Sequence, residues 1–338
     1  MKTPKKILII QLRRVGDVVF TLPVLRILRE NFPSAQIDFL VEKPSDQLVS
    51  LNPYVSRVLT YDRRRSFSWI REVRSERYDW VLDFHSNGRT LWLTFFSGAS
   101  VRAGFDGPVT RRLVYNRRFK TSDRKYLVEQ KLDILRQLGL DAGSWSWDLQ
   151  VPAPEMKWAE QFLKENGIGP NEKIVGIAPA TRRPIRTWIA ERFSEVARNM
   201  VRDSHPVLFL WGLGEKDFID GIVKDVGPGK VIVPPNTSLL QLAALIAKCS
   251  AVLAVDNGPK NMAVALGVPT ATLSGPTNPL SFNPHEDPSH VLIRDEKLFC
   301  IACGLNACPY KHECMENIRV ETVTRKLREL LNSRKVVA

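Results

Sequence analysis

The sequence predicts an α/β protein with two doubly wound parallel sheets. Short apolar segments alternate along the chain with longer amphipathic ones, which is typical of parallel strands covered by helices. At 338 residues the chain is longer than one hydrophobic core usually supports, so two domains are expected. The alternation stops once, at 139–156, where glycine, proline and aromatic residues follow no period, as they would in a linker.

Each half has its own set of expected elements. In the first half we expect strands near 6–11, 36–41, 57–61 and 79–83 and helices near 17–31, 44–50, 66–76 and 126–138. In the second half we expect strands near 173–178, 206–211, 230–233, 251–255 and 269–274 and helices near 155–166, 189–203, 215–226, 238–248 and 258–266. A last helix, near 320–333, could cross back to the first half.

The domain organisation follows from these elements. We expect one domain at 1–150, a second at 151–319 and a C-terminal helical segment at 320–338. Two doubly wound domains joined by one linker would face each other across a cleft, with the C-terminal ends of their strands on its walls.

The formal net charge is +13, and much of it lies in the first half. Residues 55–126 contain 16 Lys/Arg against 7 Asp/Glu, including the contiguous Arg63, Arg64 and Arg65 and the pair Arg117–Arg118. This predicts an anionic partner: nucleic acid, an acidic membrane surface, or a phosphorylated or carboxylated substrate. A solvated surface is the plain alternative. No nucleic-acid-binding signature accompanies the charge, so a nucleic-acid partner is not expected.

The composition, with 44% hydrophobic and 25% charged residues, is that of an ordinary soluble protein. No apolar run approaches the ~20 residues of a membrane span. The N-terminal apolar run is too short for a signal peptide. We therefore expect a cytoplasmic protein, with attraction to the inner membrane limited to peripheral contact.

The segment RRVGDVVFTLP, residues 13–23, places a lone carboxylate, Asp17, between the first expected strand and the first expected helix. A helix N-cap is the plain interpretation of an acid at this point.

Two segments of the second half predict a phosphate site. Asp256, Asn257 and Gly258 follow a strand and precede a helix whose free N–H groups would attract an anion. Thr181, Arg182, Arg183 and Arg186 follow another strand, and arginine suits a diphosphate because its planar fork donates two hydrogen bonds. A capped helix and a solvated surface are the alternatives.

The segment FLWGLGEKD, residues 209–217, contains Gly212 and Gly214 after a strand but lacks the third glycine of a dinucleotide fingerprint. A nicotinamide-dependent enzyme is therefore not expected. Glu215 could accept a hydrogen bond from a ribose hydroxyl, or it could be a surface charge that favours the helix dipole.

Several segments, taken in their order along the chain, together resemble the sequence pattern of a known protein family. They are KILIIQLRRVGDVVFTLPVLRILRENFP, YDWVLDFHSNGRT, RAGFDG, TRRPIRTW, LWGLGEKD, SLLQLAALIAKCSAVLAVDNG, GVPTATLSGPTNP and the terminal cysteine segment. Together they cover nearly the whole chain, and it resembles glycosyltransferase family 9, the lipopolysaccharide heptosyltransferases. The resemblance implies a GT-B fold, in which the first domain binds the acceptor and the second binds the nucleotide-sugar.

The resemblance implies inverting, metal-independent transfer of heptose from ADP-heptose to Kdo or heptose of the lipopolysaccharide inner core. The family's catalytic base falls on Asp17. Donor-binding positions fall on Thr181, Arg182, Arg186, Glu215, Thr237, Asp256, Asn257, Gly258 and Asn261. The basic residues Arg63, Arg64, Arg65 and Arg117 would meet the anionic acceptor. One position departs from the family pattern, because Asn261 stands where histidine is usual and an asparagine cannot be cationic.

Four of the five cysteines cluster near the C-terminus, with spacing C-x2-C-x4-C-x5-C. They are Cys300, Cys303, Cys308 and Cys314. In a cytoplasmic chain this pattern is compatible with a structural zinc ion or with reduced thiols that pack a loop. The family chemistry itself requires no cofactor.

Three alternatives stay open from the sequence. The same fold could use a different nucleotide-sugar or acceptor glycolipid. The substitution at Asn261 could mark a catalytically weak relative. A basic nucleic-acid-binding protein is the most distant alternative, because only the net charge favours it.

Overall fold

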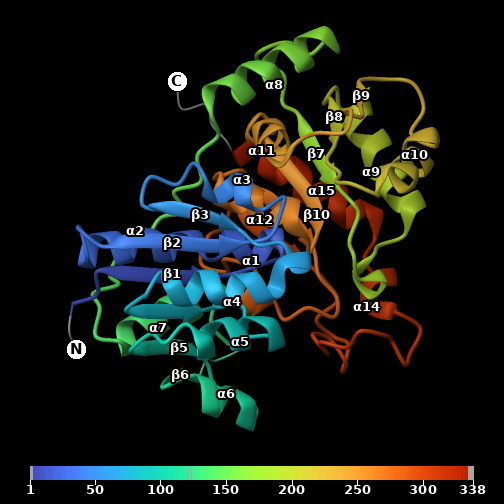
Figure 1. The fold of residues 1–338 in the computed structure, drawn as a ribbon. Helices are drawn as coiled ribbons and strands as arrows, with labels where there is room; N and C mark the ends of the chain where they lie inside the picture. Colours follow the sequence, from blue (N-terminus) through green and yellow to red (C-terminus); the bar gives the residue numbers. More distant parts are fainter. Residues whose placement is uncertain (1–2, 121, 123, 334–338) are drawn as a thin grey trace. The chain divides into compact units, whose positions relative to one another are not determined.

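The computed structural model describes residues 3–120, 122 and 124–333. The chain divides into two compact units, Met1–Gln150 and Val151–Ala338. Each unit contains one six-stranded sheet covered by helices (Figure 1). Every strand pairing described in the two sheets is parallel. The predicted α/β class with two doubly wound parallel sheets is confirmed.

The first unit has the strand order β3-β2-β1-β4-β5-β6. Its strands are β1 (Lys6–Ile10), β2 (Gln36–Val41), β3 (Arg57–Thr60), β4 (Trp80–Asp83), β5 (Val101–Phe105) and β6 (Arg117–Phe119). Its helices are α1 (Val15–Val19), α2 (Leu22–Asn31), α3 (Asp46–Val49), the 3₁₀ turn η1 (Arg63–Arg65), α4 (Ser66–Ser75), α5 (Gly88–Phe96), α6 (Val109–Val114) and α7 (Leu127–Gln137).

The second unit has the strand order β12-β11-β10-β7-β8-β9, which repeats the order of the first unit. Its strands are β7 (Val175–Ala178), β8 (Val207–Phe209), β9 (Val231–Ile232), β10 (Ala251–Val255), β11 (Thr270–Leu273) and β12 (His290–Ile293). Its helices are α8 (Ala153–Glu165), the 3₁₀ turn η2 (Pro184–Arg186), α9 (Ala190–Arg202), α10 (Lys216–Lys224), α11 (Leu239–Ala247), α12 (Gly258–Ala265), α13 (Pro279–Phe282), α14 (Glu313–Glu316) and α15 (Val320–Ser333).

The central strands explain why the sequence folds this way. In β1 the four residues Ile7–Ile10 are completely buried, and in β10 all five residues are. Strands covered by helices on both faces have no solvent side, so they are continuous apolar runs. Helix α2 packs one apolar face onto its sheet, burying Leu22, Leu25 and Leu28, and leaves its charged residues on the outside.

The strand order places a topological switch point in each unit, between β1 and β4 and between β7 and β10. At such a point the loops after two neighbouring strands lead to opposite faces of the sheet and leave a crevice at its C-terminal edge. The loops that contain Asp17 and His85 flank the first switch point. Thr181 and Asp256 flank the second.

The sequence analysis did not predict α5, β5, α6, β6, β12, the short helices α13 and α14, or the 3₁₀ turns η1 and η2. Helix α5 (GRTLWLTFF) has no helical period because it exposes Trp92, Phe95 and Phe96 as well as burying Leu93. Strands β6 and β12 are sheet edges, so they are short and not uniformly apolar. The helix predicted at 17–31 is two helices, because the chain turns between Val19 and Leu22.

Two further expectations differ from the structure. The stretch predicted to be a linker has no helix or strand over 140–152, but its Trp147 packs against Phe20 and Tyr126 of the first unit. Helix α15, which could have crossed to the first half, instead packs on α9, β10 and β11 of the second unit. Its apolar face, which includes Val323 and Leu327, is buried there, so crossing would have exposed it.

None of the helices in the described part of the chain combines the length and the apolar character needed to cross a bilayer.

Gly104 of β5 lies close to the ring of Tyr115, so a substitution at Gly104 tests how tightly this part of the first unit is packed. A Cβ at this position would lie 2.5 Å from the ring of Tyr115, whose hydroxyl donates to Asp83. We expect Gly104→Ala to lower the free energy of unfolding by about 1–3 kcal/mol, because the ring must move. Urea denaturation measures the change. Gly88→Ala is the matched control, since a Cβ there meets nothing within 4 Å.

Candidate functional site

The C-terminal edge of the first sheet places Asp17 at the switch point. Asp17 is on the short helix α1, directly after β1, and its side chain is half-buried. Its Oδ2 accepts a hydrogen bond from the backbone N–H of Arg14, at 3.0 Å. No ion pair with Asp17 occurs in the described ranges of the chain. The predicted base is therefore a half-buried carboxylate that forms no ion pair within the described part of the chain.

A buried ammonium lies behind this carboxylate. Lys131 of α7, 3% exposed, donates to Gln11 Oε1 and Thr21 Oγ1, both at 2.8 Å. Thr21 in turn donates to the backbone carbonyl of Asp17, at 2.7 Å. Burial lowers the pKa of Lys131 to about 8, although the charges of Asp17 and Asp83 oppose the shift. Lys131 thus ties the end of β1 to the turn after α1.

His85, in the loop after β4, completes the buried network. Its Nδ1 lies 3.1 Å from Gln11 Nε2, which also donates to the backbone carbonyl of Arg13. Burial lowers the pKa of His85 to about 4, and the nearby charge of Asp17 opposes this only in part. The imidazole is therefore neutral at pH 7.

Asp83 fixes the loop that contains His85. It is fully buried and accepts from the backbone N–H groups of His85 and Ser86, at 3.0 and 2.8 Å, and from the Tyr115 hydroxyl, at 2.7 Å. Burial raises the pKa of Asp83, while these hydrogen bonds act in the opposite direction. The sequence analysis missed Lys131, His85 and Asp83, because a lysine in an amphipathic helix and an acid at a strand end have plain structural interpretations.

A cluster of arginines forms around Glu42, which follows β2. Arg63 donates to both oxygens of Glu42, at 3.2 and 2.9 Å, and Arg89 donates to Oε1, at 3.1 Å. Burial opposes ionisation of Glu42, but the hydrogen bonds from Arg63 and the charges of Arg63, Arg89 and Arg13 lower its pKa. Three guanidiniums around one carboxylate leave a net positive site that suits an anion.

The other predicted acceptor residues lie outside this cluster. Arg64 is exposed, and Arg65 pairs with Glu72 of α4, at 2.7 Å. Arg117 begins the edge strand β6, four strand positions from β2, which corresponds to about 19 Å at the usual strand spacing. Of the four predicted arginines, only Arg63 contacts Glu42.

In the second unit, Asn257 joins the two loops at the switch point. Its Nδ2 donates to the backbone carbonyls of Ala178 and Ala180, both at 2.9 Å, and its Oδ1 accepts from the N–H of Lys260, at 2.9 Å. The predicted N-cap is thus also a bridge between the loop after β7 and the first turn of α12. This brings the two predicted phosphate segments together.

Charges are concentrated beside this bridge. Arg186 donates to Asp256 Oδ2, at 2.7 Å, and Lys260 Nζ lies 3.7 Å from Asp256 Oδ1. Lys260 is 1% exposed and also donates to the carbonyl of Phe282. Burial lowers the pKa of Lys260, while Asp256 opposes the shift. Two cations held by one carboxylate give the crevice a positive charge. The sequence analysis did not single out Lys260 as a site residue.

Two buried polar oxygens near the same crevice have no hydrogen-bond partner in the described part of the chain. They are Asn261 Oδ1, in the first turn of α12, and Thr277 Oγ1, in the loop after β11. Buried polar groups of native proteins are usually paired with protein, water or ligand. Asn261, at the position where the family pattern has histidine, therefore has hydrogen-bonding capacity left for a ligand.

The remaining predicted donor residues follow neighbouring strands of the second sheet. Thr181 and Arg182 follow β7, Glu215 follows β8 and Thr237 follows β9. Glu215 Oε2 accepts from the N–H of Gly212, at 2.8 Å, within its own loop. From β10 to β9 the row extends over three strand spacings, or about 14 Å. A ligand along this edge would meet cations at one end and a carboxylate further along.

The cysteine segment forms a loop between β12 and α15. Cys314 is buried, Cys300 and Cys308 are half-buried, and Cys303 is exposed, all as free thiols. Burial raises the pKa of Cys314 to about 11, and the other three cysteines add to the shift. Within residues 3–120, 122 and 124–333, no three His, Cys, Asp or Glu side chains are arranged to hold a metal ion.

Comparison with known proteins identifies the family. The model of glycosyltransferase family 9 (heptosyltransferase) matches residues 66–312, which is most of the chain. The chain belongs to this family. The lipopolysaccharide core heptosyltransferase OpsX of Haemophilus influenzae is 25% identical over 302 residues, covering 86% of this chain and 85% of that protein. Lipopolysaccharide heptosyltransferase 1 of Pseudomonas aeruginosa is 26% identical over 321 residues, covering 90% and 88%.

Solved structures share the fold. A family 9 glycosyltransferase from Veillonella parvula superposes with a TM-score of 0.85 at 23% identity and covers 99% of both chains. The ADP-heptose lipopolysaccharide heptosyltransferase II of E. coli gives a TM-score of 0.79 at 21% identity, covering 97% of this chain and 99% of its own. This family 9 member is therefore a glycosyltransferase with the two-sheet architecture of those enzymes.

The low pKa of His85 predicts a pH-dependent stability. The folded protein keeps His85 neutral until the pH nears 4, whereas the unfolded chain protonates it near 6.5. Stability is therefore lost as the pH falls from 6.5 towards 4, by about 2 kcal/mol after allowance for partial exposure of the ring. We expect His85→Gln to remove this part of the pH dependence in urea titrations. The exposed His285 gives the control His285→Gln, and an unchanged slope in His85→Gln would contradict the assignment.

Proposed function

We propose that this family 9 glycosyltransferase transfers heptose from ADP-heptose to Kdo or heptose of the lipopolysaccharide inner core, with inversion at the anomeric carbon. The observation that carries the proposal is the half-buried Asp17 at the switch point of the first sheet, which forms no ion pair with any described residue. The printed names of the relatives support the donor and acceptor classes, since they are lipopolysaccharide heptosyltransferases and one solved relative was crystallised with ADP.

The donor would bind along the C-terminal edge of the second sheet. The diphosphate would lie between the loops after β7 and β10, where Thr181, Arg182 and the first turn of α12 offer hydroxyl, guanidinium and N–H donors. The ribose would reach Glu215 after β8, and the adenine would lie near Thr237 after β9. The order of these groups along the sheet matches the order of diphosphate, ribose and base in a nucleoside diphosphate.

Asp256 and Asn257 would shape this site without acting on the sugar directly. Asp256 pairs with Arg186 and Lys260, which would place them beside the diphosphate, and Asn257 joins the two loops. Gly258 begins α12, and its backbone N–H would face the ligand. The amide oxygen of Asn261 has no partner among the described residues and could accept from a sugar hydroxyl; with the amide turned over, its NH₂ group could donate to a phosphate.

Asp17 would act as the general base. Its carboxylate takes the proton of the acceptor hydroxyl while that oxygen forms a bond to the anomeric carbon. The bond from the anomeric carbon to the β-phosphate oxygen breaks at the same time, and ADP leaves with the electron pair. Attack opposite to the leaving group inverts the anomeric configuration. Lys131 would hold α1 in position through Thr21 and Gln11.

The departing ADP would be neutralised by protein cations. Arg182, Arg186 and Lys260 lie in the loops around the proposed diphosphate position, and such preorganised charges stabilise a leaving group electrostatically. We propose on this basis that transfer needs no metal ion. The four C-terminal cysteines, which the described part of the chain does not arrange as a metal site, have no part in the proposed reaction.

The acceptor would bind at the first sheet. The positive cluster of Arg13, Arg63 and Arg89 around Glu42 suits the carboxylates and phosphates of an inner-core glycan. Arg64 is exposed beside it and could extend the site. Arg65 and Arg117 would contribute long-range charge. We propose that the enzyme works in the cytoplasm and associates peripherally with the inner membrane, where a lipid-linked acceptor is available.

Asp17→Asn tests the base. The amide keeps an oxygen that can accept from Arg14 N–H but cannot take a proton, so we expect kcat to fall by about 10²–10⁴-fold. The affinity for ADP-heptose, measured by calorimetry, should stay unchanged, because the proposed donor site lies in the other unit. Unchanged turnover in this variant would contradict the mechanism.

A thermal-shift screen of nucleotide-sugars tests the donor class. A ligand that binds the native state at 100 times its Kd stabilises it by about 2.7 kcal/mol, so we expect ADP-heptose to raise the melting temperature. GDP- and UDP-sugars should have little effect. Selective stabilisation by a GDP- or UDP-sugar would contradict ADP-heptose as the donor, while the proposed base, Asp17, would be unaffected. The variant Glu215→Gln should weaken binding of the ADP-sugar.

A further inference from the structure

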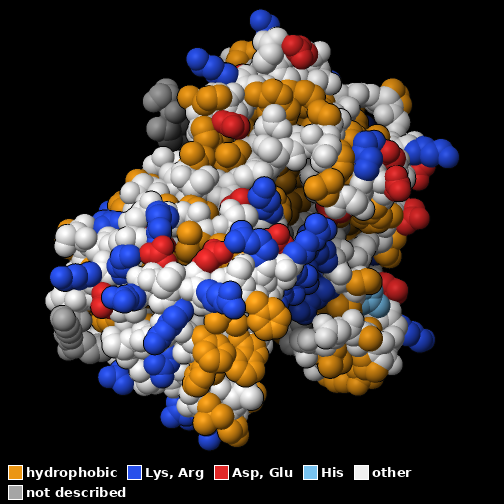
Figure 2. Space-filling view, in the orientation of Figure 1, with side chains coloured by type: hydrophobic (Ala, Val, Ile, Leu, Met, Phe, Trp, Pro, Cys, Tyr) orange, Lys and Arg blue, Asp and Glu red, His pale blue; other side chains and the backbone are white. Residues whose placement is uncertain are grey.

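An exposed apolar surface covers one side of the first unit. Large apolar side chains of α4, α5 and α6 point to solvent: Phe67 is 87% exposed, Trp92 60%, Val109 67% and Leu113 72%. Phe95 and Phe96 add to it. Figure 2 shows these helices carrying a continuous hydrophobic patch. We call Phe67, Trp92, Phe95, Phe96, Val109 and Leu113 the apolar face. Patches of this kind usually mark an interaction site.

The apolar face is preformed. The rings of Trp92 and Phe96 stack with centroids 5.7 Å apart, and Phe95 meets Phe96 edge-on, at 5.2 Å. These contacts fix the outward-facing rings of α5, so little side-chain entropy remains to be lost when a partner covers them. Three exposed aromatic side chains on a nine-residue helix are costly in water unless a partner covers them, so this arrangement favours an interaction surface.

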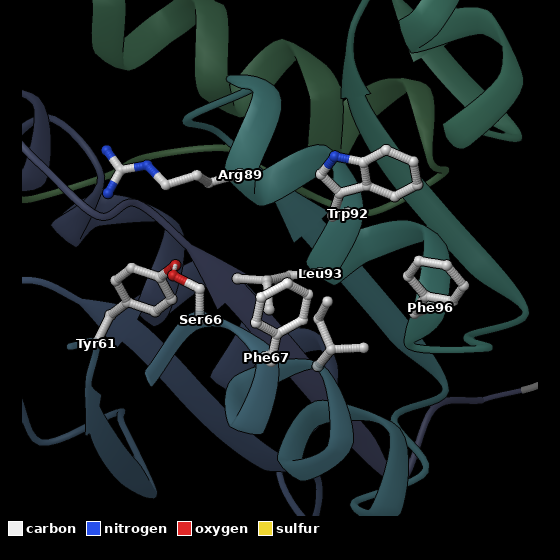
Figure 3. Close-up of a pocket in the computed structure, with 8 residues that line it drawn as sticks. Tyr61, Ser66, Phe67, Arg89, Trp92, Leu93 and Phe96 are labelled. Carbon is white, nitrogen blue, oxygen red and sulfur yellow. Dashed lines mark hydrogen bonds between the residues drawn. The ribbon is translucent and has the colours of Figure 1, made fainter. Parts of the chain in front are cut away.

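A hollow of about 360 Å³ lies between α4 and α5 (Figure 3). Phe67 and Ile70 line it from α4, Trp92, Leu93 and Phe96 line it from α5, and Arg89 lies at one end. The walls are almost entirely apolar, so the hollow suits hydrocarbon and not a sugar. Arg89 connects it to the positive cluster around Glu42.

Basic residues surround the apolar face. Residues 63–114 contain ten Lys/Arg against five Asp/Glu. Arg64 and Arg65 precede α4, Arg71 lies on α4, and Arg112 lies on α6, all of them exposed. Aromatic side chains flanked by arginines are typical of surfaces that sit at the boundary between headgroups and acyl chains. Basic residues beside an anionic leaflet are attracted to it electrostatically.

A second copy of the chain fits this surface less well. In a two-fold symmetric dimer the same patch meets itself, so the arginines around the two faces would be brought together. Like charges at such an interface oppose association, whereas the same charges favour an anionic bilayer. The charge therefore selects between the two occupants.

We propose that the apolar face is the membrane-docking surface of this enzyme, and that Phe67 and Trp92 insert at the headgroup boundary of an anionic bilayer. The proposal rests on the proposed function only in one respect, namely that the acceptor is carried by a lipid. Docking through α4 and α5 would hold the arginine cluster around Glu42 close to the bilayer surface, where the glycan of a lipid-linked acceptor begins. The hollow between the helices would receive part of an acyl chain.

Vesicle sedimentation tests the docking surface. The full chain is mixed with vesicles of phosphatidylcholine containing 30 mol% phosphatidylglycerol, or of phosphatidylcholine alone. We expect binding to the anionic vesicles, weaker binding to the neutral ones, and a loss of about tenfold or more in the partition coefficient for the double variant Phe67→Ser, Trp92→Ser. Both side chains are exposed, so the fold should survive. Phe299→Ser, at a residue 81% exposed in the second unit, is the matched control.

Activity on two acceptors separates this proposal from the proposed function. The double variant should keep wild-type turnover on a soluble, de-acylated acceptor glycan and lose activity on the same glycan in anionic vesicles. If the wild type fails on the soluble glycan, the proposed function fails, while vesicle binding still tests the docking surface. Equal vesicle binding by the variant and wild type would overturn the docking proposal, as would a wild-type dimer in light scattering that the double variant abolishes.

Discussion

The parallel order of the strands is the constraint on which both sites depend. When all strands of a sheet run in one direction, every loop that leaves a strand C-terminus emerges at the same edge. In each unit the chain reverses its direction of growth after three strands, so the loops after the first and fourth strands diverge. Asp17 and the His85 loop flank the opening in the first unit, and the loops joined by Asn257 flank it in the second.

Buried ionisable side chains lie near the C-terminal edge of each sheet and fix the loops there. Lys131, Asp83 and Glu42 in the first unit are almost removed from water, and each is satisfied by several hydrogen bonds. Lys260 and Asp256 have the same relation in the second unit. Isolated buried ions are costly, so these groups are retained with their partners as networks that fix loops. Asp17 differs from them because its side chain is only half-buried and forms no ion pair within the described residues.

Sequence reasoning identified the two sheets and the loops at the ends of their central strands, since those features leave local signals, and it predicted the two phosphate segments. Asp256 and Asn257 were recognisable as capping residues at a strand end, and the structure joins their loop to the Thr181 segment as the strand order dictates. Sequence reasoning could not predict that Arg63 pairs with Glu42 while Arg65 pairs with Glu72. The first pair joins residues far apart in the chain, and the second depends on which of several neighbouring arginines faces α4. Helix α5 was not predicted because its exposed aromatic residues leave no alternation of apolar and polar residues at helical spacing.

The sequence by itself determined the α/β class, the position of the lone acid and the residues that follow each strand. Hydrophobic periodicity and turn chemistry are properties of short segments, so they can be read without coordinates. Only the tertiary structure decided that Lys131 lies buried behind Asp17, that Arg63 and Arg89 both pair with Glu42, and that the aromatic residues of α4 and α5 form one surface. Those arrangements depend on which helices pack over which strands, and long-range packing is not encoded in any single local pattern.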